Sequence, residues 1–140
     1  MTSGQTTPDP SQRTLALRVV TMPRDTNHYG TIFGGVILSY VDQAGFVQAR
    51  RHGNHKWVTA AIDRVDFKAP VHLGDVVNFY AQTTREGTKS VSIAIDVEAE
   101  RYTDGSIVSV TSATLTMVAV DADGKAIPFR QPTTLPAASA

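Results

Sequence analysis

The sequence contains no cysteine, and this absence removes several kinds of chemistry at once. Disulfide bridges, thiolate metal sites and a cysteine nucleophile are all excluded. The 13 basic and 13 acidic residues cancel, so no net charge attracts nucleic acid or an anionic membrane surface. We therefore expect neither nucleic acid nor a membrane as a partner.

Long apolar runs are also missing. No stretch approaches the roughly 18–20 apolar residues of a membrane span, and the N-terminus has no apolar signal-peptide core. The P-loop, the GxGxxG dinucleotide motif and the GxSxG serine-hydrolase motif do not occur. We expect a cytoplasmic protein that hydrolyses no nucleotide, binds no Rossmann cofactor and uses no nucleophilic serine.

The four histidines are scattered, and none has the spacing of a metal-binding pair on one face. We expect no metal and no bound cofactor. His52 and His55 lie where the predicted helix ends and are expected in solvent.

The 140 residues suit one domain that is large enough to bury a core. Residues 1–12 and 129–140 lack periodicity and predict flexible tails around a domain at 13–128. Apolar periodicity predicts one helix from Gly34 to about Arg51. Alternating and β-branched runs predict strands at residues 14–21, 57–67, 76–85, 90–100 and 107–120.

The predicted helix has two apolar stripes. One stripe consists of Ile37, Tyr40, Val41, Ala44 and Val47. The second, roughly opposite and with Asp42 in its middle, consists of Leu38, Gly45, Phe46 and Ala49. One stripe can face a sheet, and the other needs a second cover, which a partner subunit or an apolar ligand would supply. One helix beside five strands predicts an α+β fold in which a curved antiparallel sheet wraps around the helix.

Gly34 and Gly35 open this helix. Two glycines let a ligand approach the backbone, and the free N–H groups of the first turn carry partial positive charge. Such amides can hydrogen-bond an oxygen that gains negative charge during acyl transfer. The alternative is a simple turn with close helix–sheet packing.

Asp42 lies seven or eight residues later, roughly 10–12 Å further along the helix axis, and its side chain leans back towards the glycines. Its apolar neighbours predict a desolvated carboxylate suited to act as a general base. The alternative is a structural aspartate that caps a loop or pairs with Arg50 or Lys68. Asn27, in the loop before the helix, is either a turn residue or a group that orients a water or a carbonyl.

The predicted hairpin turn after residue 85 combines cations, hydroxyls and a flexible backbone. Arg85 and Lys89 supply the charges, Thr88 and Ser90 the hydroxyls, and Gly87 the flexibility. This combination fits a phosphate cradle, and equally an ordinary charged turn.

Three segments resemble the hotdog-fold acyl-CoA thioesterases of the YciA and cytosolic acyl-CoA hydrolase type. They are DTNHYGTIFGGVILSYVDQAG, VDFKAPVHLGDVV and EGTKSVSI, within a likeness that covers roughly residues 13–125. The pattern N-x-x-G-x-x-x-G-G…D-x-x-G with a later P-x-x-x-G-D is fairly specific. The resemblance implies a hotdog fold, a sheet of five to six strands around one long helix.

The resemblance also implies hydrolysis of acyl-CoA to a fatty acid and free CoA, by general-base or covalent anhydride chemistry. Asp42 matches the catalytic carboxylate, Asn27 the loop asparagine, and Gly34 and Gly35 the amides that polarise the thioester carbonyl. The family's site lies between subunits, so Asp42 would face the other three residues across at least a dimer, and a trimer of dimers is common. Non-catalytic acyl-CoA binding and enoyl-CoA hydration or dehydration are the alternatives.

In such enzymes CoA runs towards the turn matched by residues 87–90. Candidate CoA contacts are Arg64, Lys68, Arg85, Gly87, Thr88, Lys89 and Ser90. Val36 and Tyr40 depart from common choices in the family, so the resemblance implies no particular acyl chain length.

Overall fold

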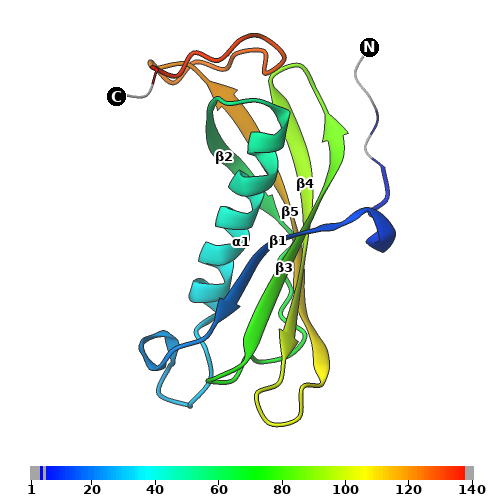
Figure 1. Ribbon diagram of the computed structural model, residues 1–140, viewed down its shortest axis with the longest axis vertical. Coiled ribbons are helices and arrows are strands. Elements are labelled where there is room, and N and C mark those ends of the chain that lie inside the picture. The colour runs from blue at the N-terminus through cyan, green and yellow to red at the C-terminus, as the bar shows by residue number, and fades with distance from the viewer. Residues whose placement is uncertain (1–3, 5, 138–140) are drawn as a thin grey trace.

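One long helix, α1 (Gly34–Ala49), lies against a single antiparallel sheet in the computed structural model, which describes residue 4 and residues 6–137 (Figure 1). A short 3-10 turn, η3 (Arg50–His52), continues the helix; two others are η1 (Pro10–Gln12) and η2 (Pro23–Asp25). The strands are β1 (Thr14–Val20), β2 (Lys56–Asp63), β3 (Val76–Glu86), β4 (Ser90–Glu100) and β5 (Ile107–Val120). The predicted α+β class is confirmed.

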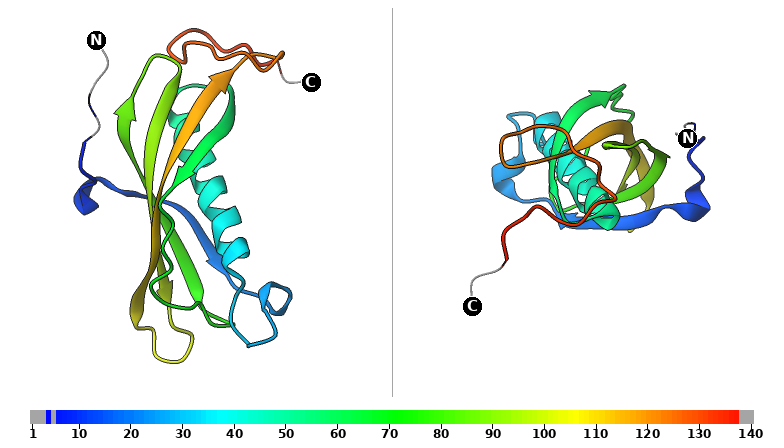
Figure 2. Two further views of the ribbon diagram at one scale, coloured as in Figure 1. Left: turned by 180° about the vertical axis from the view of Figure 1, so that it is seen from behind. Right: turned by 90° about the horizontal axis from the view of Figure 1, so that it is seen from above.

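The strand order in the sheet is β1-β3-β4-β5-β2, so β1 and β2 form its two edges. Seen from above, the sheet curves around the helix (Figure 2). The predicted second strand is too long, because β2 ends at Asp63 and not at residue 67. Arg64 has φ +54°, a conformation that takes the chain out of a strand.

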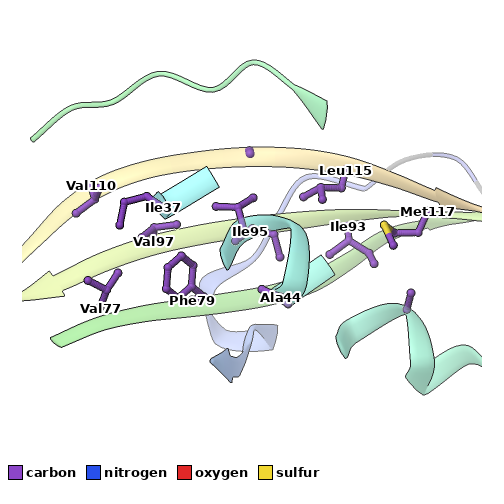
Figure 3. Packing of buried hydrophobic residues seen from close by; sticks show 14 of the residues in the cluster. Ile37, Ala44, Val77, Phe79, Ile93, Ile95, Val97, Val110, Leu115 and Met117 are labelled. Atoms are coloured by element: carbon purple, nitrogen blue, oxygen red, sulfur yellow. The ribbon is translucent and has the colours of Figure 1, made fainter. Parts of the chain in front are cut away.

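The core lies between α1 and the concave face of the sheet. Ile37 and Ala44 of the helix pack there with Phe79, Ile95 and Leu115 of the strands (Figure 3). Burying the isoleucine, leucine and phenylalanine side chains contributes about 1.5–3 kcal/mol each relative to leaving them exposed.

The predicted stripes of α1 are partly wrong. Gly45 and Ala49 face the sheet, whereas Val47 is exposed. A Cβ on Gly45 would lie 2.9 Å from the Leu115 Cδ2, so the glycine permits close approach to β5. Asp42 and Phe46 point outward with Val47, and this exposed strip is what a second cover would bury.

The predicted C-terminal boundary also falls too early. Phe129 is 2% exposed, and its amide donates to the Thr88 carbonyl (3.2 Å). We call residues 126–130 the C-terminal strap; it crosses the end of α1 at the top of Figure 1. The N-terminal segment contacts the domain too, because the Thr6 amide donates to the Thr84 carbonyl (2.7 Å). Flexibility elsewhere in the two predicted tails stays a prediction.

The strap overturns the solvent-exposed prediction for His55, which is 1% exposed. His55 Nε2 lies 2.8 Å from the Phe129 carbonyl oxygen. His52 is half-buried, with its Nδ1 3.2 Å from Glu86 and its Nε2 2.8 Å from the Thr83 hydroxyl.

Candidate functional site

The start of α1 presents two free amides. Val36 and Ile37 donate their amides to the Phe33 carbonyl (3.0 and 3.4 Å), but the amides of Gly34 and Gly35 have no acceptor among the described residues. Donors left free at a helix start carry partial positive charge and attract an anionic oxygen.

A cavity of about 310 Å³ opens beside these amides. It is lined by Ile32, Gly34, Ile37, Phe67, Lys68, Ala69, Pro70 and Val71. A Cβ on Gly34 would lie 3.4 Å from the Phe67 ring, so Gly34 is in ordinary packing contact there. Gly35 has no such neighbour within 4 Å, so packing in this chain does not explain that glycine.

The P-x-x-x-G-D motif holds this end of the molecule together. The Asp75 carboxylate accepts hydrogen bonds from the His72 amide (2.9 Å), the Tyr102 amide (3.1 Å) and the Arg101 guanidinium (2.7 Å). Burial alone would raise the pKa of Asp75, but these three donors outweigh burial and hold the pKa below its ordinary value. The motif therefore serves the structure around the site.

The hydrogen bonds around Asp75 position the start of the helix through a short series of backbone contacts. His72, which donates to Asp75, forms a bridge with Thr31, and the Val71 carbonyl accepts from the Ile32 amide (2.9 Å). Ile32 lies two residues before Gly34. The loop before the helix is thus fixed by the segment that the motif anchors.

The Asn27 side chain forms hydrogen bonds within its own loop. Its Oδ1 accepts from the amides of Tyr29 (2.9 Å) and Thr31 (3.2 Å), and its Nδ2 donates to the Thr31 hydroxyl (3.0 Å). These bonds make the turn that the sequence pattern allowed. One N–H of the amide group is left to meet another molecule.

Asp42 lies on the outward strip of α1 and borders a groove of about 510 Å³ between the helix and β2. Its carboxylate accepts a short hydrogen bond from the Thr59 hydroxyl, and the Thr59 oxygen also lies 3.3 Å from the Met117 sulfur. The partner is therefore Thr59, neither Arg50 nor Lys68. The predicted desolvation is not supplied by this chain, because Asp42 is exposed in it.

The candidate CoA contacts do not form one site within the chain. The Lys89 carbonyl accepts from Ala119, and the Thr88 carbonyl from the strap, so the turn 87–90 lies at the C-terminal end of α1. Lys68 lies at the other end, where its amide donates to the Val110 carbonyl (2.7 Å). Ser90 pairs with Val118, about 26 Å along β5 from Val110.

The other cations are similarly dispersed. Arg64 borders a hollow of about 200 Å³ that includes Asp96 and Ser112, away from the cavity at the start of α1. Arg85 follows a register shift near the end of β3 and borders a separate hollow with Thr6 and Glu86. Within one chain, Lys68, Arg64 and Arg85 border three different cavities.

Sequence reasoning missed Thr59 and Trp57, which line the groove beside Asp42. Their only sequence signal is the period of two that places both on the helix-facing side of β2. Among the described residues, no group of three or more His, Asp or Glu could hold a metal ion. No helix in that part of the chain is long and apolar enough to cross a membrane.

Known proteins with related sequences and structures identify the fold. The Thioesterase superfamily model matches residues 29–105. The chain is 39% identical over 132 residues to the acyl-CoA thioester hydrolase YciA of Salmonella typhimurium, covering 92% of this chain and 97% of the relative.

Two solved structures are similar as well. Cj0915, a hexameric hotdog fold thioesterase of Campylobacter jejuni, has a TM-score of 0.77 and 42% identity, covering 82% of this chain and 89% of that one. The hexameric thioesterase y2039 of Yersinia pestis has a TM-score of 0.79 and 39% identity, covering 83% and 94%. Fold and site together define a hotdog-fold thioesterase. The chain belongs to the thioesterase superfamily, which confirms the predicted family and fold.

Proposed function

We propose that this enzyme hydrolyses acyl-CoA thioesters to a free fatty acid and CoA, with Asp42 as the catalytic carboxylate. The observation that carries the proposal is Asp42 itself, exposed at an apolar groove in a chain of this family. The mechanism needs a base near the thioester carbon and donors near its oxygen. Thr59, hydrogen-bonded to Asp42, is a positioning residue for the base.

The reaction can follow either of two routes. In the first, Asp42 takes a proton from a water, the water oxygen bonds to the thioester carbon, and the C–S bond breaks as the proton passes to the CoA thiolate. In the second, the Asp42 oxygen displaces the thiolate to form an anhydride, which water then hydrolyses. In both, the Gly34 and Gly35 amides hold the negative oxygen of the tetrahedral intermediate.

We further propose that the site is completed by a second copy of the chain. Eight residues at about 1.5 Å each place Asp42 roughly 12 Å along the axis from Gly34. A base and an oxyanion donor must each lie about 3 Å from the reacting group, which that spacing within one helix does not favour. Asn27 and the glycines of one protomer would then face Asp42 of its partner in a dimer, itself part of a trimer of dimers.

The two-chain site also bears on CoA binding. Lys68 and the turn 87–90 are far apart in one chain, and a second copy offers a way to bring one protomer's turn near its partner's helix start. The candidate CoA contacts stay those named from the sequence, Arg64, Lys68, Arg85, Gly87, Thr88, Lys89 and Ser90. Among the described residues, Arg85 and Lys89 form no ion pair, so their charges are available to phosphates.

The activity is tested by steady-state hydrolysis of an acyl-CoA panel with detection of the free thiol. We expect thiol release by the wild type and a kcat about 10²- to 10⁴-fold lower for Asp42→Asn, the range for a lost general base. Wild-type kcat in the variant would show that Asp42 is not the base. Water addition to enoyl-CoA without thiol release would instead favour the hydratase alternative.

The two-chain arrangement is tested by mixing inactive variants. Asn27→Ala and Asp42→Asn chains are each expected to be nearly inactive alone. In a mixed dimer, one site carries both changes and the other carries neither, so co-expression should restore up to about half of the wild-type activity per mixed dimer. No recovery in mixed dimers isolated with two affinity tags would place both residues in one chain's site.

A further inference from the structure

The groove beside Asp42 has a direction. Its lining includes Asp42 and Phe46 of α1 and Trp57 and Thr59 of β2. Because β2 starts near the end of α1 and runs back along it, Trp57 lies further towards the C-terminal end of the helix than Thr59. Phe46 is one turn beyond Asp42 in the same direction. The groove therefore leads from the Asp42–Thr59 pair towards Phe46 and Trp57.

Trp57 is held rigidly at that far end. Its side chain is 5% exposed, and its indole N–H donates to the Gly53 carbonyl (3.0 Å). Behind it lie Phe129 of the strap, with ring centroids 5.8 Å apart, and His55 at 6.2 Å. The indole cannot swing aside without breaking this packing, so it acts as a fixed wall.

Phe46 closes the helix side of the same end. Its ring is 40% exposed, and the Arg50 guanidinium lies 6.0 Å from its centroid on the following turn. Arg50 is itself held by a hydrogen bond to Asn54 (3.2 Å). The apolar lining thus ends at a cation, which an alkyl chain does not favour as a neighbour.

We propose that this groove holds the acyl chain of the substrate and that Trp57 and Phe46 limit its length; the inference rests on the proposed function. Phe46 lies about 6 Å along the axis from Asp42. An extended alkyl chain needs about 1.3 Å per methylene, from a carbon–carbon bond of about 1.5 Å. The groove therefore takes about five carbons beyond the thioester carbon, so butyryl- to hexanoyl-CoA fit and palmitoyl-CoA does not.

The test is kcat/KM for butyryl-, octanoyl-, lauroyl- and palmitoyl-CoA with the wild type and two wall variants. Phe46→Ala changes an exposed ring and keeps the core intact, whereas Trp57→Phe shortens the fixed wall. Each should raise the lauroyl-to-butyryl ratio of kcat/KM by about tenfold or more, the scale of discrimination by a hydrophobic pocket. Ile107→Ala is the matched control, an exposed residue about 33 Å along β5 from Met117, and should leave the ratio unchanged.

The outcomes separate this inference from the proposed function. A wild type that hydrolyses butyryl-CoA while both wall variants keep its chain-length profile overturns the acyl groove and leaves the activity standing. Variants that change subunit assembly by light scattering, with the same profile, show that the groove is a subunit contact and also overturn it. Absence of hydrolysis for every thioester refutes the activity itself.

Discussion

The two ends of α1 differ in how exposed the nearby aromatic side chains are. Around its start, Tyr29, Phe33 and Phe67 are 79%, 51% and 49% exposed. Around its end, Trp57 and Phe129 are 5% and 2% exposed. At the start, two backbone amides also have no acceptor in the part of the chain that the structure describes, whereas the strap and the first residues of β2 enclose the end.

The difference teaches where stability and reactivity reside in this chain. Buried aromatic rings at the end of α1 contribute to folding, because each removes a large apolar surface from water. Exposed rings and free amides at the start contribute little to folding and are available to substrate and partner subunit. Removal of the buried Phe129 ring at the closed end should therefore cost stability, and a change at the free amides of the open end should cost activity.

The largest effect is expected at the closed end. Phe129→Ala should lower the free energy of unfolding by about 3–5 kcal/mol, because it leaves a cavity between the strap, Trp57 and His55. Chemical denaturation measures the loss, and kcat for butyryl-CoA in the folded fraction should stay near wild type. Tyr29→Ala, on a ring that is 79% exposed, is the control at the open end. Equal destabilisation by Phe129→Ala and Tyr29→Ala would show that the two ends of α1 contribute equally to stability.

A somewhat smaller effect is expected from Asp75, which supports the open end from within. Asp75→Asn should cost about 3 kcal/mol near neutral pH, the lower range for breaking a buried ion pair, because Arg101 keeps its charge without a partner. Chemical denaturation near pH 7 measures this loss.

The same variant has a defined pH dependence. The folded-state pKa of Asp75 is lowered, so the unfolded chain binds the proton more readily and the wild type gains stability as pH rises through this range. The contribution is fully present above the ordinary carboxyl pKa and is lost as pH falls through the lowered folded pKa. The gap between wild type and Asp75→Asn should hence narrow below about pH 4. Asp104→Asn, an exposed control, should show a much smaller gap; an equal gap would contradict the role of burial.

Thr59→Val tests the residue that positions Asp42 in the groove. The change removes the hydroxyl that donates to Asp42 and keeps the shape of the side chain. We expect kcat to fall about tenfold, or 1.4 kcal/mol in the barrier, with KM and thermal stability nearly unchanged. Thr59→Ser should restore most of the kcat because it keeps the donor. A loss that serine does not restore would indicate packing against Met117 instead.

The sequence predicted most of the fold because its signals are local. Clean alternation from Val91 to Val97 located β4, and Gly34–Gly35 located the start of α1. Gly45 was assigned to the wrong face of the helix because a glycine has no side chain to indicate which face is buried. Its close contact with Leu115 exists only in the folded chain. His55 was misassigned because the residue that buries it, Phe129, lies 74 positions away.

The site was predictable in its residue types and not in its geometry. Asp42 and the glycine pair stand out in the sequence because an acid and two glycines are unusual in an apolar helix. Thr59 does not stand out, because one threonine in a strand is common. Its bond to Asp42 joins a helix to an edge strand, and no local periodicity encodes such a contact.

The sharpest test of the open end comes from two glycines in one helix. A Cβ on Gly35 meets nothing within 4 Å, so Gly35→Ala should raise stability by up to about 1 kcal/mol. Gly45→Ala should lower stability by about 1–3 kcal/mol, because Leu115 must move. The space beside Gly35 would let a thioester approach the Gly35 amide. In that case the Gly35→Ala variant should have a kcat/KM at least about tenfold lower than the wild type, together with a higher melting temperature. If the Gly35→Ala variant is both more stable and fully active, Gly35 is needed for neither packing nor catalysis.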